Sequence, residues 1–325
     1  MARGGRVVRL AGAWRLLFLA TFALALVAPS RAIAQGCCTP GAGPLTGLRA
    51  GGLSAFTVRG GLAWDRYDLR TTLKGSEETE PLAERKARYS RLTLQLEAGL
   101  PAGMRFGVEA PWEFRNREVV LPIGGEEPAR LDFDNSAFGD LTTTLVVEVA
   151  PRAATPRPWS IEVGGGVKWA TGSIDAEDDG FALPPELQSG TGSVDPLAVA
   201  AARWYAADWG VVGTFLYRAT GTNDIGYRFG READIGLAAW WVIVPAVSAG
   251  ADIRWRSAGH DEFLDVTRPN SGGTRWLAGP RLAARLPYPG PSFEVAGLFP
   301  VHQELNGTQL GVDVQWTMAI SWQGR

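Results

Sequence analysis

The chain has 325 residues and a formal net charge of −2, and 46 % of its residues are hydrophobic. This balance of charge excludes the large basic surface that a nucleic-acid-binding protein needs, so we expect no nucleic-acid partner. Glycine (41 residues) and tryptophan (13 residues) are both frequent, which fits either a soluble β protein or a membrane barrel with an apolar residue at every second position.

The N-terminus has the three parts of a secretory signal peptide. Four arginines occur among the first fifteen residues, the apolar run "LLFLATFALALVA" follows, and Ala32-Ile33-Ala34 supplies the small residues of a cleavage site. The apolar run is shorter than the ~20 residues that a membrane anchor needs. We therefore predict a signal peptide at 1–34, cleaved after Ala34, and a short periplasmic segment at 35–51.

Cys37 and Cys38 directly follow the predicted cleavage site. Adjacent cysteines bridge each other only with strain, so we expect no disulfide between them. Three interpretations stay open: no chemical role, pairing with a partner or redox chemistry, and lipidation of Cys37, for which Ala34-Gln35-Gly36 is a poor match.

After residue 51 the chain alternates repeatedly between apolar and polar residues. In "RLTLQLEAGL", for example, leucine occupies positions 92, 94, 96 and 100. A period of two predicts β-strands rather than helices. The predicted strands are twelve, at 56–64, 91–100, 105–115, 140–150, 160–170, 194–205, 209–218, 232–243, 246–256, 274–287, 291–301 and 309–322. The segment at 194–205 is the least regular because it is apolar on both faces.

The connections between these strands alternate in length. The long segment "DLRTTLKGSEETEPLAERKA" is followed by the short "PAG", and this order continues along the chain except at the last connection, "QELNGT". Outer-membrane barrels have long outside loops and short periplasmic turns, whereas a soluble sandwich has no reason to sort its loops in this way. We therefore predict an all-β fold, a closed antiparallel transmembrane β-barrel of twelve strands over residues 52–325.

Aromatic residues mark the ends of the apolar stripes, as the two interfacial girdles of a barrel do. We assign to the outer girdle Trp64, Trp112, Phe114, Trp169, Tyr217, Trp255 and Trp276. We assign to the periplasmic girdle Phe56, Phe106, Trp204, Trp209, Trp241, Phe293 and Trp322. In the alternative, a soluble sandwich, the same side chains fill a core.

The last predicted strand, 309–322, has to close the barrel against the first strand. We assign its alternate residues from Leu310 and Val312 to Trp322 to the lipid-facing side. Its start, "QLGVDVQW", resembles the signal by which the barrel-assembly machinery recognises a closing strand. We therefore expect outer-membrane lipids and this machinery as partners.

Three stretches carry a family resemblance: "FGDLTTTLVVEV" (138–149), "GGGVKWATGS" (164–173) and "GTGSVDPLAVAAARW" (190–204). In this order they resemble the outer-membrane family labelled for the meta-pathway of phenol degradation, often called transporters. That family has proline where this chain has Ala170. The resemblance implies a barrel and the passage of small molecules. It brings no catalytic residues, and it says little about the substrate.

If the apolar stripes face lipid, the alternate residues face the lumen. Our candidates for lining it and setting selectivity are Arg59, Arg91, Glu97, Arg105, Glu109, Glu113, Arg115, Lys168, Arg254, Arg256, Arg281 and Arg285. Charges that leave water must pair, so the alternative is a salt-bridged wall with only a structural role. We also expect arginines of the ninth and tenth strands to face carboxylates of the third to fifth strands, which gives a transverse field.

The predicted function is the passage of a small-molecule solute, aromatic or another small organic compound, with the long loops gating access. One alternative is a barrel that only displays its loops. Another is a hydrolase that uses His260-Asp261-Glu262. The acidic "DAEDDG" (175–180) lacks the ligand spacing of a calcium loop. We therefore expect no enzyme activity, no cofactor and no metal site.

Overall fold

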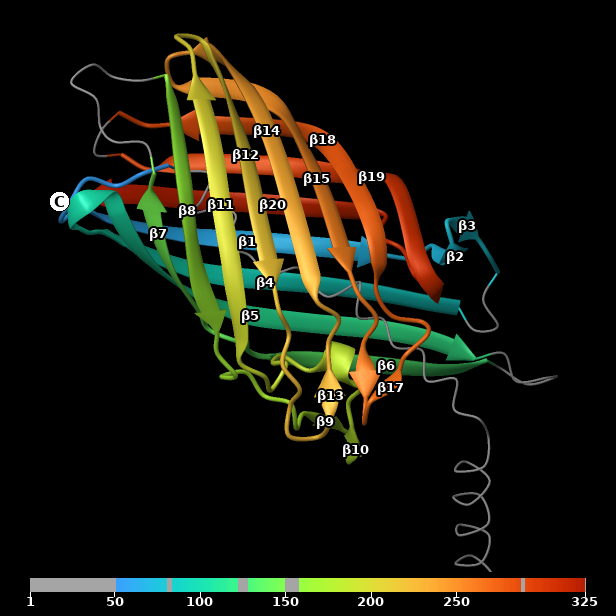
Figure 1. Cartoon of the computed structure of the whole chain (residues 1–325). Coiled ribbons are helices and arrows are strands. Elements are labelled where there is room, and N and C mark those ends of the chain that lie inside the picture. The colour runs from blue at the N-terminus through green and yellow to red at the C-terminus, as the bar shows by residue number, and fades with distance from the viewer. Residues whose placement is uncertain (1–50, 81–83, 122–127, 150–157, 288–289, 325) are drawn as a thin grey trace, which may run out of the picture. The chain divides into compact units, whose positions relative to one another are not determined.

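A computed structural model describes residues 51–80, 84–121, 128–149, 158–287 and 290–324, and within them the chain is almost entirely β-structure (Figure 1). The predicted signal peptide, the pair of cysteines and most of the predicted periplasmic segment lie outside the described residues. No helix in the described ranges is long and apolar enough to cross a membrane.

Twelve strands in the described part of the chain form the wall of a closed antiparallel barrel, as predicted. They are β1 (Val58–Leu69), β4 (Glu84–Gly99), β5 (Met104–Leu121), β7 (Thr142–Glu148), β8 (Trp159–Lys168), β11 (Asp195–Tyr205), β12 (Trp209–Arg218), β14 (Glu232–Val244), β15 (Val247–Ala258), β18 (Gly273–Arg285), β19 (Ser292–Leu310) and β20 (Val314–Gly324). Each strand pairs with the next, and β20 pairs with β1 from Val58↔Gly324 to Asp68↔Val314, which closes the ring. The irregular segment 194–205 is β11.

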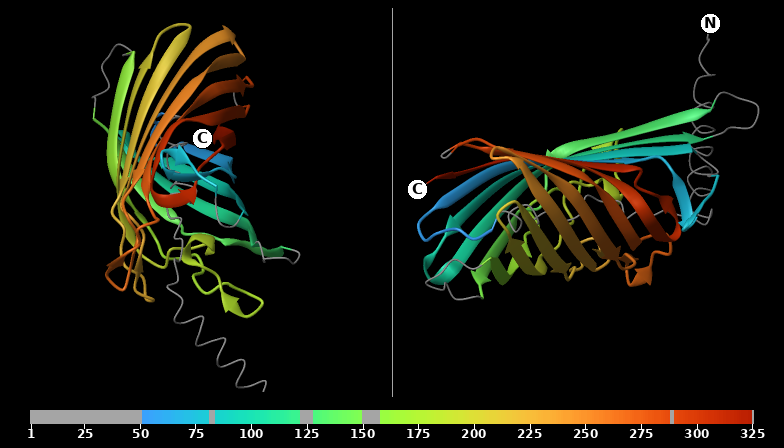
Figure 2. Two further views of the ribbon diagram at one scale, coloured as in Figure 1. Left: turned by 90° about the vertical axis from the view of Figure 1, so that its right-hand side faces the viewer. Right: turned by 90° about the horizontal axis from the view of Figure 1, so that it is seen from above.

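The remaining elements are short and mostly belong to the connections. They are β2 (Thr72–Gly75), β3 (Glu77–Glu78), β6 (Ala129–Phe138), β9 (Glu177–Asp178), β10 (Phe181–Ala182), β13 (Tyr227–Arg228), β16 (Glu262–Phe263), β17 (Val266–Thr267) and the 3-10 turns η2 (Pro101–Gly103) and η3 (Pro185–Leu187). The strand β6 pairs with the last ten residues of β5. Together they project beyond the other strands (Figures 1 and 2).

The connections sort by length as predicted. Short ones, such as 206–208 and 245–246, join strands at one end of the barrel, which we call the short-turn end. Long ones, such as 169–194 and 259–272, lie at the opposite end, which we call the long-loop end. The two ends of the barrel therefore differ chemically, since one is a rim of tight turns and the other a group of folded loops.

Apolar side chains cover the outside of the barrel. On β20, Trp316, Met318 and Trp322 are 38 %, 48 % and 44 % exposed, whereas Gln315, directly before Trp316, is 2 % exposed. Many aromatic residues of the two predicted girdles are likewise exposed, among them Trp112, Phe114, Trp169, Trp276, Phe106, Trp209, Trp241 and Phe293. In a soluble sandwich these side chains fill a core, so their exposure rules that alternative out.

The boundary of the last strand differs from the prediction. β20 begins at Val314 rather than at residue 309, and the predicted loop at 303–308 is part of β19. Leu310 and Val312 are 0 % and 1 % exposed and pack inside the barrel, so their assignment to the lipid-facing side was wrong. The alternating pattern runs on through this turn, where the backbone of Gly311 bonds Thr71 rather than the neighbouring barrel strand.

Candidate functional site: the charged lumen and the loop inside it

Buried ion pairs line the lumen near the short-turn end. The Arg105 guanidinium lies between the carboxylates of Glu97 on β4 and Glu162 on β8, with 2.7 Å from Arg105 Nη2 to Glu162 Oε2. Glu97 also accepts a hydrogen bond of 2.9 Å from Arg59, and Glu162 accepts one of 3.0 Å from Arg203. We call these five residues the Arg105 cluster. The five residues come from five strands, and Arg105 on β5 reaches past β7 to Glu162 on β8, so the cluster joins the part of the wall from β1 to β11.

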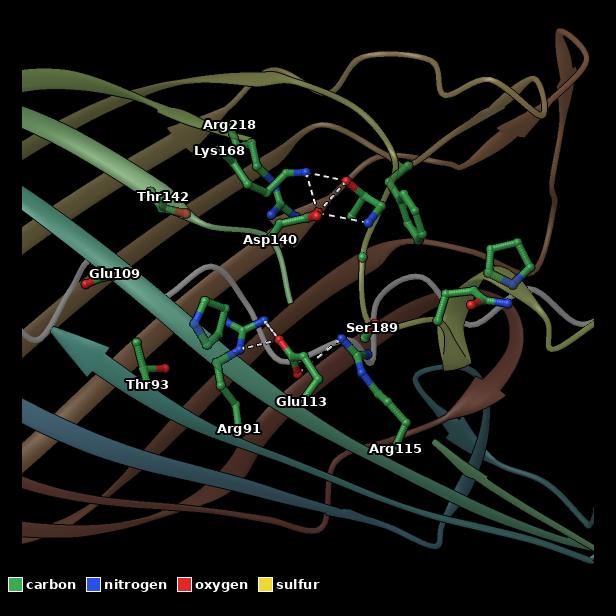
Figure 3. Close-up of a pocket in the computed structure, with 16 residues that line it drawn as sticks. Arg91, Thr93, Glu109, Glu113, Arg115, Asp140, Thr142, Lys168, Ser189 and Arg218 are labelled. Carbon is green, nitrogen blue, oxygen red and sulfur yellow. Dashed lines mark hydrogen bonds and ion pairs between the residues drawn. The ribbon is translucent and has the colours of Figure 1, made fainter. Parts of the chain in front are cut away.

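A second set of charges lies further along β4 and β5. Arg91 approaches Glu113 to 2.6 Å, and Arg115 lies 3.3 Å from the other oxygen of the same carboxylate. Glu109 accepts a hydrogen bond of 3.2 Å from Gln95. Figure 3 shows Arg91, Glu113 and Arg115 together on one wall.

A third set lines the same cavity as the second one (Figure 3). Lys168 Nζ lies 2.8 Å from Asp140 Oδ2 and 3.1 Å from Asp195 Oδ2, and Arg218 lies 2.7 Å from Glu232. Burial raises the pKa of Asp140, but the Lys168 ammonium and backbone N–H groups outweigh it and hold that pKa below its usual value. The carboxylate therefore stays ionised.

Most of the predicted lumen residues occupy inward-facing positions. Arg254 lies 2.6 Å from Asp234, Arg256 pairs with Glu232, and Arg281 lies 2.6 Å from Glu294. The exception is Arg285, which is exposed at the rim of the short-turn end. Whether any of these residues sets selectivity stays a prediction.

The expected transverse field is not what the charges form. The arginines of β15 pair with Asp234 and Glu232 on the neighbouring β14, so the two signs alternate locally instead of standing on opposite walls. The sequence analysis missed several members of this network: Arg117, Asp140, Glu186, Asp195, Arg203, Arg218, Glu232 and Asp234. Those on strands share the inward parity of their neighbours, which is the signal that could have found them.

One apolar stripe interrupts the charged wall. Val146 on β7, Val199 and Ala201 on β11, and Leu216 on β12 face inward and bury each other. The stripe crosses Gly164 on β8, where an added Cβ would lie 2.2 Å from the carbonyl oxygen of Leu145. The lumen therefore offers both charged and apolar surface.

We call the connection between β8 and β11, residues 169–194, the inner loop. Its residues around Leu183 and Leu187 are buried in the long-loop end of the lumen, whereas Phe181 of β10 is exposed. Glu186 in η3 accepts a hydrogen bond of 3.0 Å from Arg117, and its backbone oxygen accepts one of 3.3 Å from Arg115. Asn135 on β6 donates to the backbone oxygen of Leu187 over 2.8 Å. The loop is thus fastened to β5 and β6 by a few polar contacts.

Apolar side chains of the inner loop complete this closure. Leu183 and Leu187 are 5 % and 0 % exposed and pack in one cluster with Tyr67, Tyr89, Leu277, Leu298, Leu310 and Val312 from the surrounding wall. Between the inner loop and the two charged walls remains a cavity that offers about 50 Å³ to water-sized molecules. That is room for a few waters.

The proposed hydrolase residues are not assembled as a catalytic group. His260 is exposed, with Nδ1 3.2 Å from the backbone oxygen of Arg268. Asp261 instead accepts hydrogen bonds from the Tyr227 hydroxyl (2.6 Å) and the Gly230 N–H (2.8 Å). These two hydrogen bonds lower the pKa of Asp261. Burial, together with the charges of Glu186 and Glu232, outweighs them and raises that pKa to about 6. In the described residues no group of three or more potential ligands is placed to hold a metal ion.

Comparison with solved structures supports the same architecture. An outer membrane channel from Pseudomonas putida F1 superposes with a TM-score of 0.61 at 12 % sequence identity, over 84 % of this chain and 97 % of that one. The chain has the fold of an outer-membrane β-barrel. A FadL homologue from Pseudomonas aeruginosa (TM-score 0.41, 10 % identity, 82 % and 90 % covered) and the β domain of the Bordetella autotransporter BrkA (TM-score 0.43, 10 % identity, 81 % and 99 % covered) are more distant.

No protein-family model matches the chain, and no curated protein matches it. The resemblance to the phenol meta-pathway family therefore stays a prediction.

Proposed function

We propose that the protein is an outer-membrane channel for small organic solutes, and that the inner loop gates it. The lumen supports this proposal because it combines ion pairs with the apolar stripe of Val146, Val199, Ala201 and Leu216. A surface of both kinds suits a compound with an apolar body and a polar group, such as a small aromatic acid or alcohol. The similar fold of the Pseudomonas putida protein, which is an outer membrane channel, agrees with this assignment.

One observation carries the proposal. At the long-loop end, the lumen is filled by a connection between strands, whose Leu183 and Leu187 pack against the wall. The inner loop is held by hydrogen bonds of Glu186 and Leu187 with Arg115, Arg117 and Asn135. Asp140 accepts further bonds from the backbone N–H groups of Gly172 and Thr191, and the apolar cluster around Leu183 and Leu187 completes the contact. A loop can leave the lumen without breaking the backbone hydrogen bonds between the wall strands. The passage of a solute is therefore compatible with a closed wall.

The orientation and the biogenesis are part of this proposal. Long loops face the outside in outer-membrane barrels, so the inner loop guards the external entrance, and the short-turn end faces the periplasm. In this proposal the signal peptide directs export of the chain, and the barrel-assembly machinery inserts it into the outer membrane. We assign recognition by that machinery to residues 309–322, of which Val314 to Trp322 form most of β20.

A barrel that only displays its loops is the second candidate. The observation that favours it is the apolar cluster, in which Leu183 and Leu187 meet wall residues from β1, β4, β18 and β19. Such packing suits a permanent plug. The two candidates differ in a single respect, namely whether the inner loop moves.

Planar-bilayer recording separates the two candidates. The full-length protein is compared with a variant in which residues 176–186 are replaced by a Gly-Ser-Gly linker. The matched control shortens the hairpin at 263–266, which contributes no residue to the cavity. We expect rare openings in the wild type and in the control, and a larger, steady conductance in the shortened variant. No conductance in any of the three proteins would exclude a channel, and equal conductance in all three would exclude gating by the inner loop.

A further inference from the structure

An apolar groove runs over the lipid-facing side of the wall where β18, β19, β20, β1 and β4 adjoin. It has a volume of about 630 Å³ and is lined by outward side chains that include Leu62, Trp64, Leu92, Phe293, Met318 and Ile320. Leu62, Phe293 and Met318 are 39 %, 43 % and 48 % exposed. A concave apolar surface on the membrane side of a barrel fits hydrocarbon chains.

A group of cations lies directly beyond this groove, towards the long-loop end. Arg66 follows Trp64 by two residues on the outward face of β1, which is about 7 Å along the strand. On β20 the residue opposite Arg66 is Trp316, and the one opposite Trp64 is Met318. On β4, Arg88 stands opposite Asp68 of β1. The surface therefore changes from apolar to cationic between Trp64 and Arg66 on β1, and between Leu92 and Arg88 on β4.

These cations are only partly neutralised. Asp68 accepts hydrogen bonds of 3.0 Å from both Nε and Nη2 of Arg66, and one of 3.1 Å from Nε of Arg88. One carboxylate thus serves two guanidinium groups, and the Arg88 side chain is 53 % exposed. Lys86, the next outward residue of β4, is also exposed. Glu118 lies opposite Lys86 but pairs with Arg130 at 3.4 Å.

We propose that this surface binds one phosphorylated glycolipid of the outer leaflet. Its acyl chains lie in the groove, and a head-group phosphate contacts Arg66, Arg88 and Lys86. Tryptophan side chains mark the membrane–water interface, and Trp64 and Trp316 border the cations, so these side chains stand at the level of the lipid phosphates. Guanidinium groups bind phosphate through paired, charge-assisted hydrogen bonds. The long-loop end faces the outer leaflet, which selects the glycolipid over the phospholipids of the inner leaflet.

Native mass spectrometry of the full-length protein in detergent tests the proposal. The probes are bisphosphorylated lipid A, lipid A without phosphate, and phosphatidylglycerol. We expect the wild type to retain bisphosphorylated lipid A best. The double variant Arg66→Gln/Arg88→Gln should bind it about tenfold more weakly, since two charge-assisted contacts are lost. Lys86→Gln, which disturbs no ion pair of Asp68, should weaken binding about threefold.

Arg130→Gln is the matched control, because Arg130 is an outward arginine at the same end of the barrel, with 65 % of its side chain exposed. It should bind lipid A as the wild type does. Heat-modified mobility in gels confirms that each variant is a folded barrel. Equal retention of lipid A without phosphate, equal retention of phosphatidylglycerol, or an equal loss in Arg130→Gln would each overturn the proposal.

Discussion

At the scale of single residues, the lumen depends on charges that have no access to bulk water. In the Arg105 cluster, Arg105 has 5 % of its side chain exposed, and its partners Glu97 and Glu162 have 9 % and 3 % exposed. Removing one member of such a group takes charge-assisted hydrogen bonds from buried partners, whereas an exposed pair contributes little. The ion pairs therefore constrain the wall strongly, whatever part they have in passage.

We predict that Arg105→Met lowers the free energy of unfolding by about 1.5–3 kcal/mol, because Glu97 and Glu162 each lose a charge-assisted hydrogen bond and keep only Arg59 and Arg203 as partners. Urea-induced unfolding in lipid vesicles, followed by tryptophan fluorescence, measures the change. Arg130→Met is the control, since Arg130 has 65 % of its side chain exposed, and should change the value by less than about 1 kcal/mol. Equal effects of the two substitutions would show that the cluster is not desolvated.

Asp261 gives a pH dependence to the loops at the long-loop end. Its pKa rises from 3.8 to about 6 in the folded protein, so the folded loops bind the proton more tightly than the unfolded ones. Their stability is therefore full below about pH 4, falls as the pH rises to about 6, and is constant above that. The loss is at most about 3 kcal/mol.

Hydrogen exchange at the amides of 227–230 between pH 4 and 7 measures this effect. After correction for the intrinsic rate, protection should fall by up to about 100-fold as the pH rises. Asp261→Asn removes the titrating group and should give a flat profile. A wild-type profile that is flat, or that rises with pH, contradicts this assignment.

At the scale of elements, glycine decides how closely β7 and β8 approach. A Cβ on Gly164 would lie 2.2 Å from a backbone oxygen, whereas a Cβ on Gly213 of β12 would meet nothing within 4 Å. We predict that Gly164→Ala destabilises the barrel by about 1–3 kcal/mol. Gly213→Ala should leave the stability unchanged or slightly higher, because alanine restricts the unfolded chain. The same urea unfolding measures both, and equal stabilities would mean that the two strands separate easily.

The strands themselves could be predicted from the sequence, because lipid outside and a polar lumen inside impose a period of two on every one of them. β11 shows the limit of this rule: Leu197, Val199 and Ala201 are apolar but face inward. The end of β19 shows another limit, since Leu310 and Val312 continue the alternation although they pack inside the barrel. A local pattern reports two faces, but it does not say which solvent each face meets.

The inner loop could not be predicted for a different reason. Glu186 meets Arg117 across 69 residues of sequence, and Leu187 meets Asn135 across 52. In the sequence the segment reads as a polar connection with a few apolar residues, like the other long loops. β5 and β6 lie beside the inner loop only because the strands close into a ring. The position of this loop inside the lumen therefore depends on the tertiary structure. The inward-facing charges of the wall could be predicted in part from the parity of each strand, but their pairing could not, because it depends on the register between strands.

At the scale of the whole molecule, the closed ring leaves no strand edge unpaired in lipid, and β1 and β20 complete it. The closed wall and the inner loop are held by different kinds of contact. The wall is held by hydrogen bonds between strands and by buried ion pairs, whereas the inner loop is held by side-chain contacts, and its strands β9 and β10 pair only with each other in the described residues. Passage in this account is therefore a movement of the loop within a fixed barrel.

A reversible lock on the inner loop tests this account most directly. Asn135→Cys and Pro185→Cys, introduced beside the contact in which Asn135 donates to the Leu187 backbone over 2.8 Å, are joined by a short thiol cross-linker cleavable by reduction, in a chain with Cys37 and Cys38 changed to serine. Single-channel conductance is recorded before and after reduction. We predict a closed channel when the two sites are joined and a return of openings when the link is cut. A joined protein that conducts as well as the reduced one would contradict the account.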